Sequence, residues 1–178
     1  MALEIERRFL VCAGPDGAAG SWRPHVTWQA RLQQGYLSAS AEGFTTRVRS
    51  DGCGGAWLTL KCGSTASDGL VRHEFEYPIP AADAEALLAL CPTALRKWRY
   101  GLDLPDGDWV LDVFEDANAP LVIAEVELAS PQQAVVVPSW CVQEITGQGR
   151  YSNAALAASP LAAWPAAERC ALLALLSG

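Results

Sequence analysis

The first ten residues, MALEIERRFL, place charged side chains at every second position. Residues i and i+2 of a β-strand face the same side, so Glu4, Glu6 and Arg8 would share one face of a first strand, with Ile5 on the other. Carboxylate oxygens are the ligands that hard divalent cations prefer, and a guanidinium is a strong donor to phosphate oxygens. The opening strand therefore has the side chains for a site that holds a metal ion and a phosphate group together.

Pairs of like charges at the same spacing recur along the chain. For any one strand, the solvated face of an antiparallel sheet would explain such charges. Like-charged neighbours repel unless opposite charges from another strand lie between them. The basic pairs are Arg47/Arg49 and Lys97/Arg99, and the acidic pairs are Glu74/Glu76 and Glu125/Glu127. Their repetition favours an enclosed, charged interior over a wet outer face.

A closed or nearly closed barrel accounts for this repetition, because the charges would line its interior while helices cover its apolar outer face. The residues between the charges would then point outward under helices or loops; these are Ile5, Val48, Trp98 and Val126. Clustered carboxylates without His or Cys favour Mg²⁺ or Mn²⁺, and clustered Arg and Lys favour phosphate oxygens. The residues thus predict binding of a metal-complexed polyphosphate.

Alternating apolar and polar residues, bounded by turn-forming residues, predict a chain made mainly of strands. The expected strands are residues 3–12, 33–40, 44–50, 56–63, 71–79, 95–104, 108–116 and 121–129. Pro80 leads into an amphipathic helix over residues 81–90, and Ser130-Pro131 suits the start of a short helix. The Ala- and Leu-rich end, from about Asn153, is expected to be helical with breaks at Pro160 and Pro165. Strands with intervening helices indicate the α+β class.

Composition sets further bounds. The chain has 178 residues, 51% of them apolar, which fits a single domain over residues 1–178 with its own core. A formal net charge of −7 argues against binding to nucleic acid or to an anionic membrane. We expect neither a transmembrane helix nor a signal peptide. The six cysteines form no CxxC pair and are expected to be small buried residues in a reducing, cytoplasmic environment.

The charged strands also carry a family likeness. The segment EIERRFLV resembles the ExExK signature of the CYTH superfamily, the triphosphate tunnel metalloenzymes. Further segments follow in the family's order: QGYL (34–37), TRVR (46–49), LTLK (58–61), HEFEY (73–77), KWRY (97–100), LDVFE (111–115), EVEL (125–128) and RYSNAALA (150–157). The chain is most similar to the short, single-domain bacterial branch. The resemblance implies an eight-stranded antiparallel β-barrel, a tunnel with a charged interior and flanking helices.

The resemblance also implies an activity on a triphosphate group with a divalent metal. Members of the superfamily hydrolyse inorganic tripolyphosphate, thiamine triphosphate or nucleoside triphosphates, and some are adenylate cyclases. By position, the implied metal-binding residues are Glu4, Glu6, Glu76, Asp112, Glu125 and Glu127. The implied phosphate-binding residues are Arg8, Arg47, Arg49, Lys61, Lys97, Arg99 and Arg150. Arg72 and Glu74 match family positions as well.

One position departs from the family's pattern. The lysine that usually ends ExExK is Arg8 here. In the short bacterial branch that lysine works with the tyrosine matching Tyr36 to activate the attacking water, so the resemblance makes Arg8 and Tyr36 the candidate catalytic pair. A guanidinium stays protonated and is a poor general base. The sequence therefore supports phosphate binding at Arg8 more directly than proton transfer.

These observations favour a metal-dependent triphosphatase, a phosphoanhydride hydrolase acting on inorganic tripolyphosphate with Mg²⁺ or Mn²⁺. The main alternative is a slow or non-catalytic module that binds a polyphosphate or nucleotide, which phosphate release in Mg²⁺ would distinguish. An adenylate cyclase or thiamine triphosphatase of the same superfamily, and a structural barrel without a ligand, remain open. The expected partner is a small-molecule triphosphate, and a homodimer stays open as the assembly.

Overall fold

A computed structural model gives the structure of residues 3–12, 22–39, 44–62 and 71–177, with the backbone alone described at residues 3, 4, 71 and 72. Its strands are β1 (Leu3–Val11), β2 (Val26–Ala39), β3 (Thr45–Ser50), β4 (Ala56–Cys62), β5 (Val71–Pro78), β6 (Thr93–Leu102), β7 (Asp108–Phe114), β8 (Val122–Glu127) and β9 (Cys141–Glu144). The α-helices are α1 (Ala81–Leu90), α2 (Asn153–Ala158) and α3 (Ala166–Leu176). Four 3₁₀ helices are η1 (Arg23–His25), η2 (Asp116–Asn118), η3 (Gly149–Tyr151) and η4 (Leu161–Ala163).

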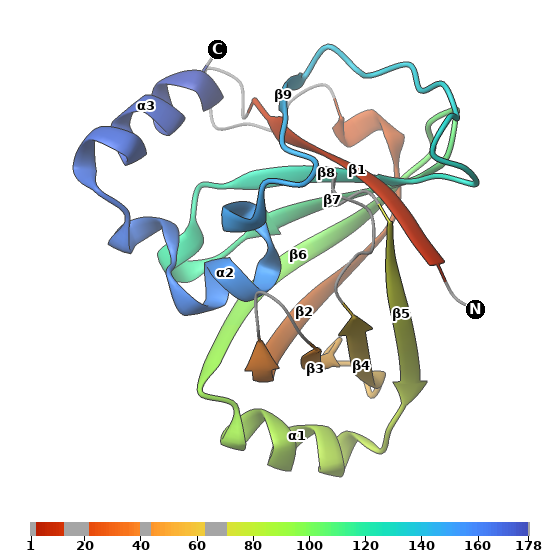
Figure 1. The fold of residues 1–178 in the computed structure, drawn as a ribbon, viewed down its shortest axis with the longest axis vertical. Helices are drawn as coiled ribbons and strands as arrows, with labels where there is room; N and C mark the ends of the chain where they lie inside the picture. The colour runs from red at the N-terminus through yellow and green to blue at the C-terminus, as the bar shows by residue number, and fades with distance from the viewer. Residues whose placement is uncertain (1–2, 13–21, 40–43, 63–70, 178) are drawn as a thin grey trace.

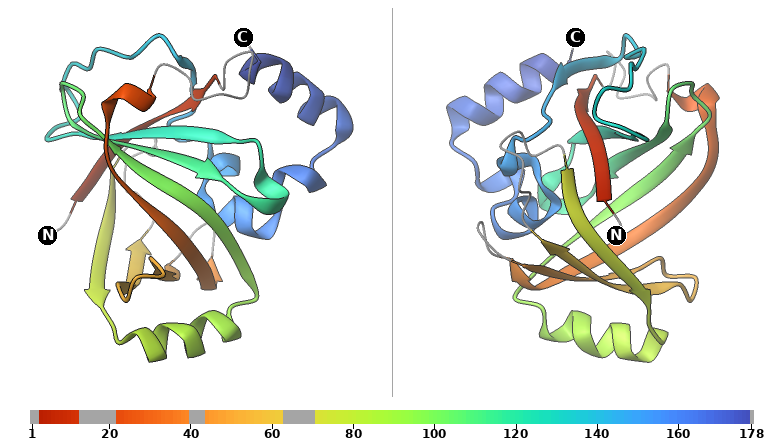
Figure 2. Two further views of the ribbon diagram at one scale, coloured as in Figure 1. Left: turned by 180° about the vertical axis from the view of Figure 1, so that it is seen from behind. Right: turned by 45° about the vertical axis from the view of Figure 1, so that its right-hand side comes forward.

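Eight of the strands close into an antiparallel barrel (Figure 1). They follow the order β5-β4-β3-β2-β6-β7-β8-β1, and β1 pairs back onto β5 to complete the ring. β5 meets only the first residues of β1, while β9 pairs with the last residues on the same edge. Figure 2 shows β1 and β5 side by side at this closure. The expected α+β fold with an eight-stranded barrel is confirmed, with a ninth strand added at one edge.

The registers of the ladders put the charged residues on the inner face. Directly paired residues in an antiparallel ladder share a face of the sheet. Arg8 is opposite Glu125, and Arg99 is opposite Asp112. On β3, β4 and β5, Arg47 is opposite Thr59, and Thr59 is opposite Glu76. Since these sets lie on one continuous face, the period-two pattern of the sequence is the pattern of the barrel interior.

The residues between the charges lie on the outside, as expected. Val48 is fully buried beneath α1, where it packs with Ala56 and Ala84. Val126 belongs to a second apolar cluster on the outer face of the other wall, and Ile5 and Trp98 pack against that cluster. Burial of these side chains stabilises a barrel whose interior is polar.

A third apolar cluster fills one end of the barrel. Its members on the strands include Leu10, Phe114 and Ile123, which lie on the same inner face as the charges. Leu156 of α2 and Leu172 of α3 pack against them. Figure 1 shows α2 and α3 together at this side of the sheet. The carboxyl-terminal helices therefore close one end of the barrel with apolar side chains.

Two of the three helical predictions are confirmed, and one is wrong. Helix α1 has the predicted bounds, and the helical end is broken between α2 and α3, where Pro160 and Pro165 lie. The short helix expected after Ser130-Pro131 is wrong, because residues 129–140 form neither helix nor strand. Asp106 of the β6–β7 turn holds this segment instead: its carbonyl accepts from Gln133 Nε2 and its carboxylate from the Val136 amide.

Two strands and the cysteines also differ from expectation. β2 begins seven residues earlier than predicted, and β9 was not predicted because it has only four residues. All six cysteines are free; Cys53 and Cys170 are exposed and the other four are half-buried, so the expectation of buried cysteines is wrong. In the described part of the chain, no helix is long and apolar enough to cross a membrane.

Gly35 lies where α1 approaches β2. A Cβ atom built at this position would lie 2.7 Å from Cys91 Sγ and 3.1 Å from Leu88 Cδ2. Both distances are too short for an ordinary side-chain contact, so the missing side chain is what lets the end of α1 pack on the strand.

Gly35→Ala should therefore reduce the free energy of unfolding by about 1–3 kcal/mol, because the added methyl overpacks this contact. Urea unfolding followed by circular dichroism measures the change. Gly149→Ala is the control, since nothing lies within 4 Å of its added Cβ. Equal unfolding midpoints for the two variants would contradict the packing argument.

Candidate active site

The first group of charges surrounds a completely buried carboxylate. We call it the Asp112 cluster: Arg8, Lys97, Arg99, Asp112 and Glu125. Arg99 binds Asp112 through two parallel hydrogen bonds of 2.7 Å, from Nε to Oδ1 and from Nη2 to Oδ2. Lys97 Nζ donates to Asp112 Oδ2 as well. Burial alone would raise the pKa of Asp112, but the charges of Arg99 and Lys97 hold it below its ordinary value.

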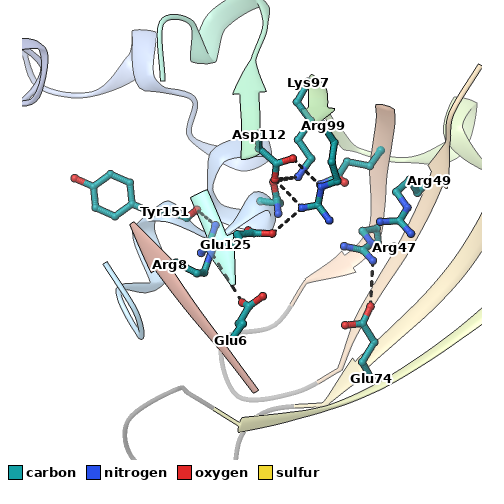
Figure 3. Close-up of polar contacts among 12 residues, drawn as sticks. Glu6, Arg8, Arg47, Arg49, Glu74, Lys97, Arg99, Asp112, Glu125 and Tyr151 are labelled. Atoms are coloured by element: carbon teal, nitrogen blue, oxygen red, sulfur yellow. Dashed lines mark hydrogen bonds and ion pairs between the residues drawn. The ribbon is translucent and has the colours of Figure 1, made fainter. Parts of the chain in front are cut away.

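Glu125 joins this carboxylate to β1. Arg99 Nη2 donates to Glu125 Oε2 at 2.6 Å, and Arg8 Nε donates to Glu125 Oε1 at 3.0 Å (Figure 3). Burial would raise the pKa of Glu125, but Arg99 and Arg8 outweigh it and lower the pKa far below its usual range. Glu125 is thus an ionised carboxylate held between two guanidinium groups.

The Asp112 cluster also contacts the carboxyl-terminal segment. Arg8 Nη2 donates to the backbone carbonyl of Tyr151 at 3.1 Å. Lys97 Nζ donates to Asn153 Oδ1, the first residue of α2, at 3.0 Å. Burial lowers the pKa of Lys97 to about 7, although the charge of Asp112 opposes this shift. Two cations of the interior therefore fix the position of η3 and α2.

The second group lies on β3, β4 and β5, and we call it the Glu76 cluster: Arg47, Arg49, Thr59, Glu74 and Glu76. Glu76 accepts hydrogen bonds from Arg49 Nη2 at 2.9 and 3.1 Å, from Arg47 Nη2 at 3.2 Å and from Thr59 Oγ1 at 2.8 Å. Glu74 accepts from Arg47 Nη2 at 3.2 Å and pairs with Lys61 Nζ at 2.7 Å. On this wall, three cations are thus paired with two carboxylates.

The two clusters lie close together inside the barrel. Figure 3 places the guanidinium of Arg99 between Glu125 on one side and Arg47 and Arg49 on the other. Burial, Arg47 and Arg99 all lower the pKa of Arg49, while Glu76 opposes them. Burial is the largest of these causes, and the repulsion from Arg47 and Arg99 shows that three guanidinium groups lie near one another here. Such a space favours an anion with several oxygen atoms.

Tyr36 lies on the inner face of β2, next to this space. It is 3% exposed, and its hydroxyl oxygen accepts a 2.8 Å hydrogen bond from Gln34 Nε2. Burial raises the pKa of Tyr36 well above its ordinary value, against the charges of Arg47 and Arg8. The phenol therefore stays protonated and can donate a hydrogen bond into the site.

The expected metal ligands fall into two groups. Asp112 and Glu76 are bound by the cations described above. Glu6 lies 3.9 Å from Arg8 Nε and is directly opposite Glu127 in the β1–β8 ladder. Carboxylates in such a position repel unless a cation lies near them. The side chain of Glu4, which comes two residues before Glu6 in β1, is not among the side chains that the structure describes. Among the described side chains, no three acidic or metal-binding groups are gathered closely enough to hold one ion.

The structure brings most of the expected basic residues together, with one exception. Arg150 lies over the Trp164 ring, 3.8 Å from its centroid, and donates to Glu168 Oε2 at 2.6 Å. Its side chain is 47% exposed and belongs to none of the clusters above. The side chain of Arg72 lies outside the described atoms.

Three polar residues of the site were not expected to act there. Thr59 is directly opposite Arg47 and Gln34 is directly opposite Arg49, so both side chains face the barrel interior. The two-residue alternation of a strand was a sufficient signal for both. Asn153 reaches Lys97 from a helix, and no local pattern indicates such a contact.

Comparisons with known proteins bear on this architecture. The family model described as CYTH domain matches residues 2–155. The chain is 38% identical over 160 residues to an inorganic triphosphatase of Nitrosomonas europaea, covering 88% of this chain and 97% of that protein. It is 33% identical over 162 residues to an inorganic triphosphatase of Acetivibrio thermocellus, covering 90% and 96%. A crystal structure of an inorganic triphosphatase aligns with a TM-score of 0.60 at 34% identity, covering 88% of this chain and 95% of the other.

The family match spans most of the chain, and both relatives are more than 30% identical over nearly their whole length. The resemblance that the ordered motifs indicated is thereby confirmed. This chain belongs to the CYTH domain family.

Proposed function

We propose that this protein hydrolyses a triphosphate with the help of a divalent cation, and that inorganic tripolyphosphate is its substrate. The observation that carries the proposal is the convergence of Arg47, Arg49 and Arg99 inside a closed barrel. Guanidinium groups bind phosphate oxygens in planar, charge-assisted hydrogen bonds. The names of the two relatives, both inorganic triphosphatases, support the choice of tripolyphosphate over a nucleotide.

Charge neutralisation and positioning would supply the catalysis. Water attacks the terminal phosphorus in line with the leaving phosphate, and the barrel's fixed cations stabilise the negative charge on the phosphate oxygens. Neighbouring carboxylates already hold these cations inside the barrel, so the cations would need little further movement once a phosphate chain has replaced Glu76 on Arg47 and Arg49. A covalent nucleophile is not needed for this chemistry.

The inner carboxylates near the start of β1 are suited in type to a hard cation. Glu6 and Glu127, directly opposite each other in the β1–β8 ladder, would hold Mg²⁺ or Mn²⁺ through oxygen atoms alone, with Glu4 as the further ligand implied by the sequence. A cation bound there would neutralise phosphate oxygens and lower the pKa of a water molecule on it. Glu125 would at the same time keep Arg8 and Arg99 in place.

Arg8 and Tyr36 would position groups and not remove protons. Burial lowers the pKa of Arg8, but Glu125 and Glu6 outweigh it and raise the pKa above its ordinary value. Arg8 therefore remains a cation that anchors Glu125. Tyr36, as a protonated phenol, would donate a hydrogen bond to a phosphate oxygen.

Phosphate release in Mg²⁺ tests the proposal directly. Tripolyphosphate, thiamine triphosphate, ATP and longer polyphosphate form the substrate panel, and tripolyphosphate should give the highest kcat/KM. Tight binding of tripolyphosphate without turnover would instead establish the binding module. Faster release from another member of the panel would replace tripolyphosphate as the substrate.

Arg49→Ala should weaken tripolyphosphate binding by roughly tenfold to a hundredfold, since a charge-assisted contact in a partly desolvated site contributes about 1.5–3 kcal/mol. Titration calorimetry in Ca²⁺, chosen to suppress turnover, gives the affinity. Arg96→Ala is the matched control, because Arg96 lies on the outer face and pairs with Asp116. Equal affinities in both variants would remove Arg49 from the site.

Glu127→Gln should raise the Mg²⁺ concentration needed for half-maximal activity by roughly tenfold or more, because a carboxamide keeps the shape but loses the charge. Phosphate release at increasing Mg²⁺ measures the shift. Glu85→Gln, on the exposed side of α1, is the control. An unchanged Mg²⁺ dependence would argue against a metal ligand at Glu127.

Arg8→Lys should lower the free energy of unfolding by about 1–3 kcal/mol, because one ammonium cannot replace both hydrogen bonds to Glu125 and Tyr151. Turnover should be slower, with the same pH profile as the wild type. Arg7→Lys, the same change on the outer face, is the control for unfolding. A faster Arg8→Lys enzyme with a shifted acid limb would restore the base role of the family's lysine.

A further inference from the structure

Three buried side-chain atoms in the described part of the chain have no hydrogen-bond partner there, and all three lie on β2 and β3. They are Gln34 Oε1, Arg47 Nε and Arg49 Nε. Gln34 is directly opposite Arg49 in the β2–β3 ladder, and Tyr36 is directly opposite Arg47. These four residues form one patch of the inner face, which we call the β2–β3 patch.

Gln34 is the most deeply buried member of this patch. Its exposed fraction is 0%, and its Nε2 donates to the Tyr36 hydroxyl oxygen at 2.8 Å. Only half of the amide is therefore satisfied. A buried polar group without a partner destabilises the fold, so a residue that keeps one indicates a ligand or a functional role.

The chemistry of the three atoms indicates which groups could supply their missing hydrogen bonds. Both Arg Nε groups are donors, and phosphate oxygens would accept from them. Gln34 Oε1 is an acceptor, and a fully ionised phosphate has no hydrogen to donate to it. The charges of Arg47 and Arg49 also disfavour a metal ion at this wall. A water molecule can donate one hydrogen to Gln34 Oε1 and still direct a lone pair at a neighbouring phosphorus.

We propose that Gln34 binds the water molecule that attacks the terminal phosphate; this inference rests on the proposed hydrolysis of tripolyphosphate. Gln34 Oε1 accepts a hydrogen bond from the water, and Nε2 holds Tyr36 so that its hydroxyl donates toward the phosphate. Glutamine orients the attacking water in the same manner in the GTPases. Gln34 thereby marks the side of the phosphate from which the attack comes.

The reaction step balances without a proton on Gln34. The water oxygen forms a bond to the terminal phosphorus, and the bond from that phosphorus to the bridging oxygen breaks. Pyrophosphate leaves with the bonding electron pair. One hydrogen of the water stays on the new hydroxyl of orthophosphate, and the other is transferred to a phosphate oxygen of the products.

Gln34→Met tests this assignment, because the thioether fills the same space and removes both polar groups. The kcat for tripolyphosphate should fall by roughly tenfold to a hundredfold, while the Kd for tripolyphosphate in Ca²⁺ stays within about twofold. The melting temperature should be equal to or above that of the wild type, since a half-satisfied amide is lost. Gln33→Met is the matched control, because Gln33 is exposed on the opposite face of the same strand.

A second variant separates water binding from an effect through Tyr36. In a double-mutant cycle with Tyr36→Phe, Gln34→Met should still lower kcat, because the water contact does not depend on the phenol. Equal kcat values for Tyr36→Phe and the double variant would mean that Gln34 acts only through Tyr36, and would overturn the assignment. Should Gln34→Met not fold, Gln34→Asn withdraws the amide by one methylene and is expected to show the same loss of kcat.

The remaining outcomes distinguish this inference from the proposed function. An active wild type with an equally active Gln34→Met overturns the inference alone. A loss of affinity in proportion to the loss of kcat also overturns it, because Gln34 would then be a phosphate-binding residue. A wild-type protein that releases no phosphate from any substrate overturns both.

Discussion

The barrel interior is organised around a carboxylate that water does not reach. Burying one charge costs several kcal/mol unless a partner of opposite sign is held in good geometry. Asp112 meets this condition by binding Arg99 at two points and Lys97 at a third. The buried cations need carboxylate partners in turn, and Glu125 is the partner of both Arg99 and Arg8. Charges on neighbouring strands thus balance one another, and β2 contributes the uncharged Gln34 and Tyr36 to the same face.

The same balance has a consequence for any anionic ligand. Before a phosphate arrives, Glu76 already occupies the guanidinium groups of Arg47 and Arg49. A phosphate chain must therefore compete with an internal carboxylate. On the proposed function, this competition would favour a longer phosphate chain, which could contact several cations at once, over a single phosphate.

How far the sequence predicted the structure depended on how local the signal was. The inward positions of Glu6, Arg8 and Arg99 followed from the two-residue period of a strand, and α1 followed from its turn signals and apolar residues. Arg150 could not be placed this way, because its position over Trp164 depends on how the terminal helices pack. The helix expected after Ser130 was wrong since contacts with the β6–β7 turn outweigh a favourable N-cap. That Gln34 Oε1 lacks a hydrogen-bond donor depends on the atoms around it, and only the three-dimensional structure could reveal this.

The carboxyl-terminal helices set a limit on how the chain can be shortened. Leu156, Leu172 and their neighbours fill one end of the barrel, and Tyr151 and Asn153 satisfy two of its buried cations. A truncation before residue 150 would uncover an apolar lining and leave Arg8 and Lys97 each short of an acceptor. The segment from Tyr151 onward is therefore an integral part of the barrel, and a minimal catalytic fragment ending at β8 or β9 is not a viable design.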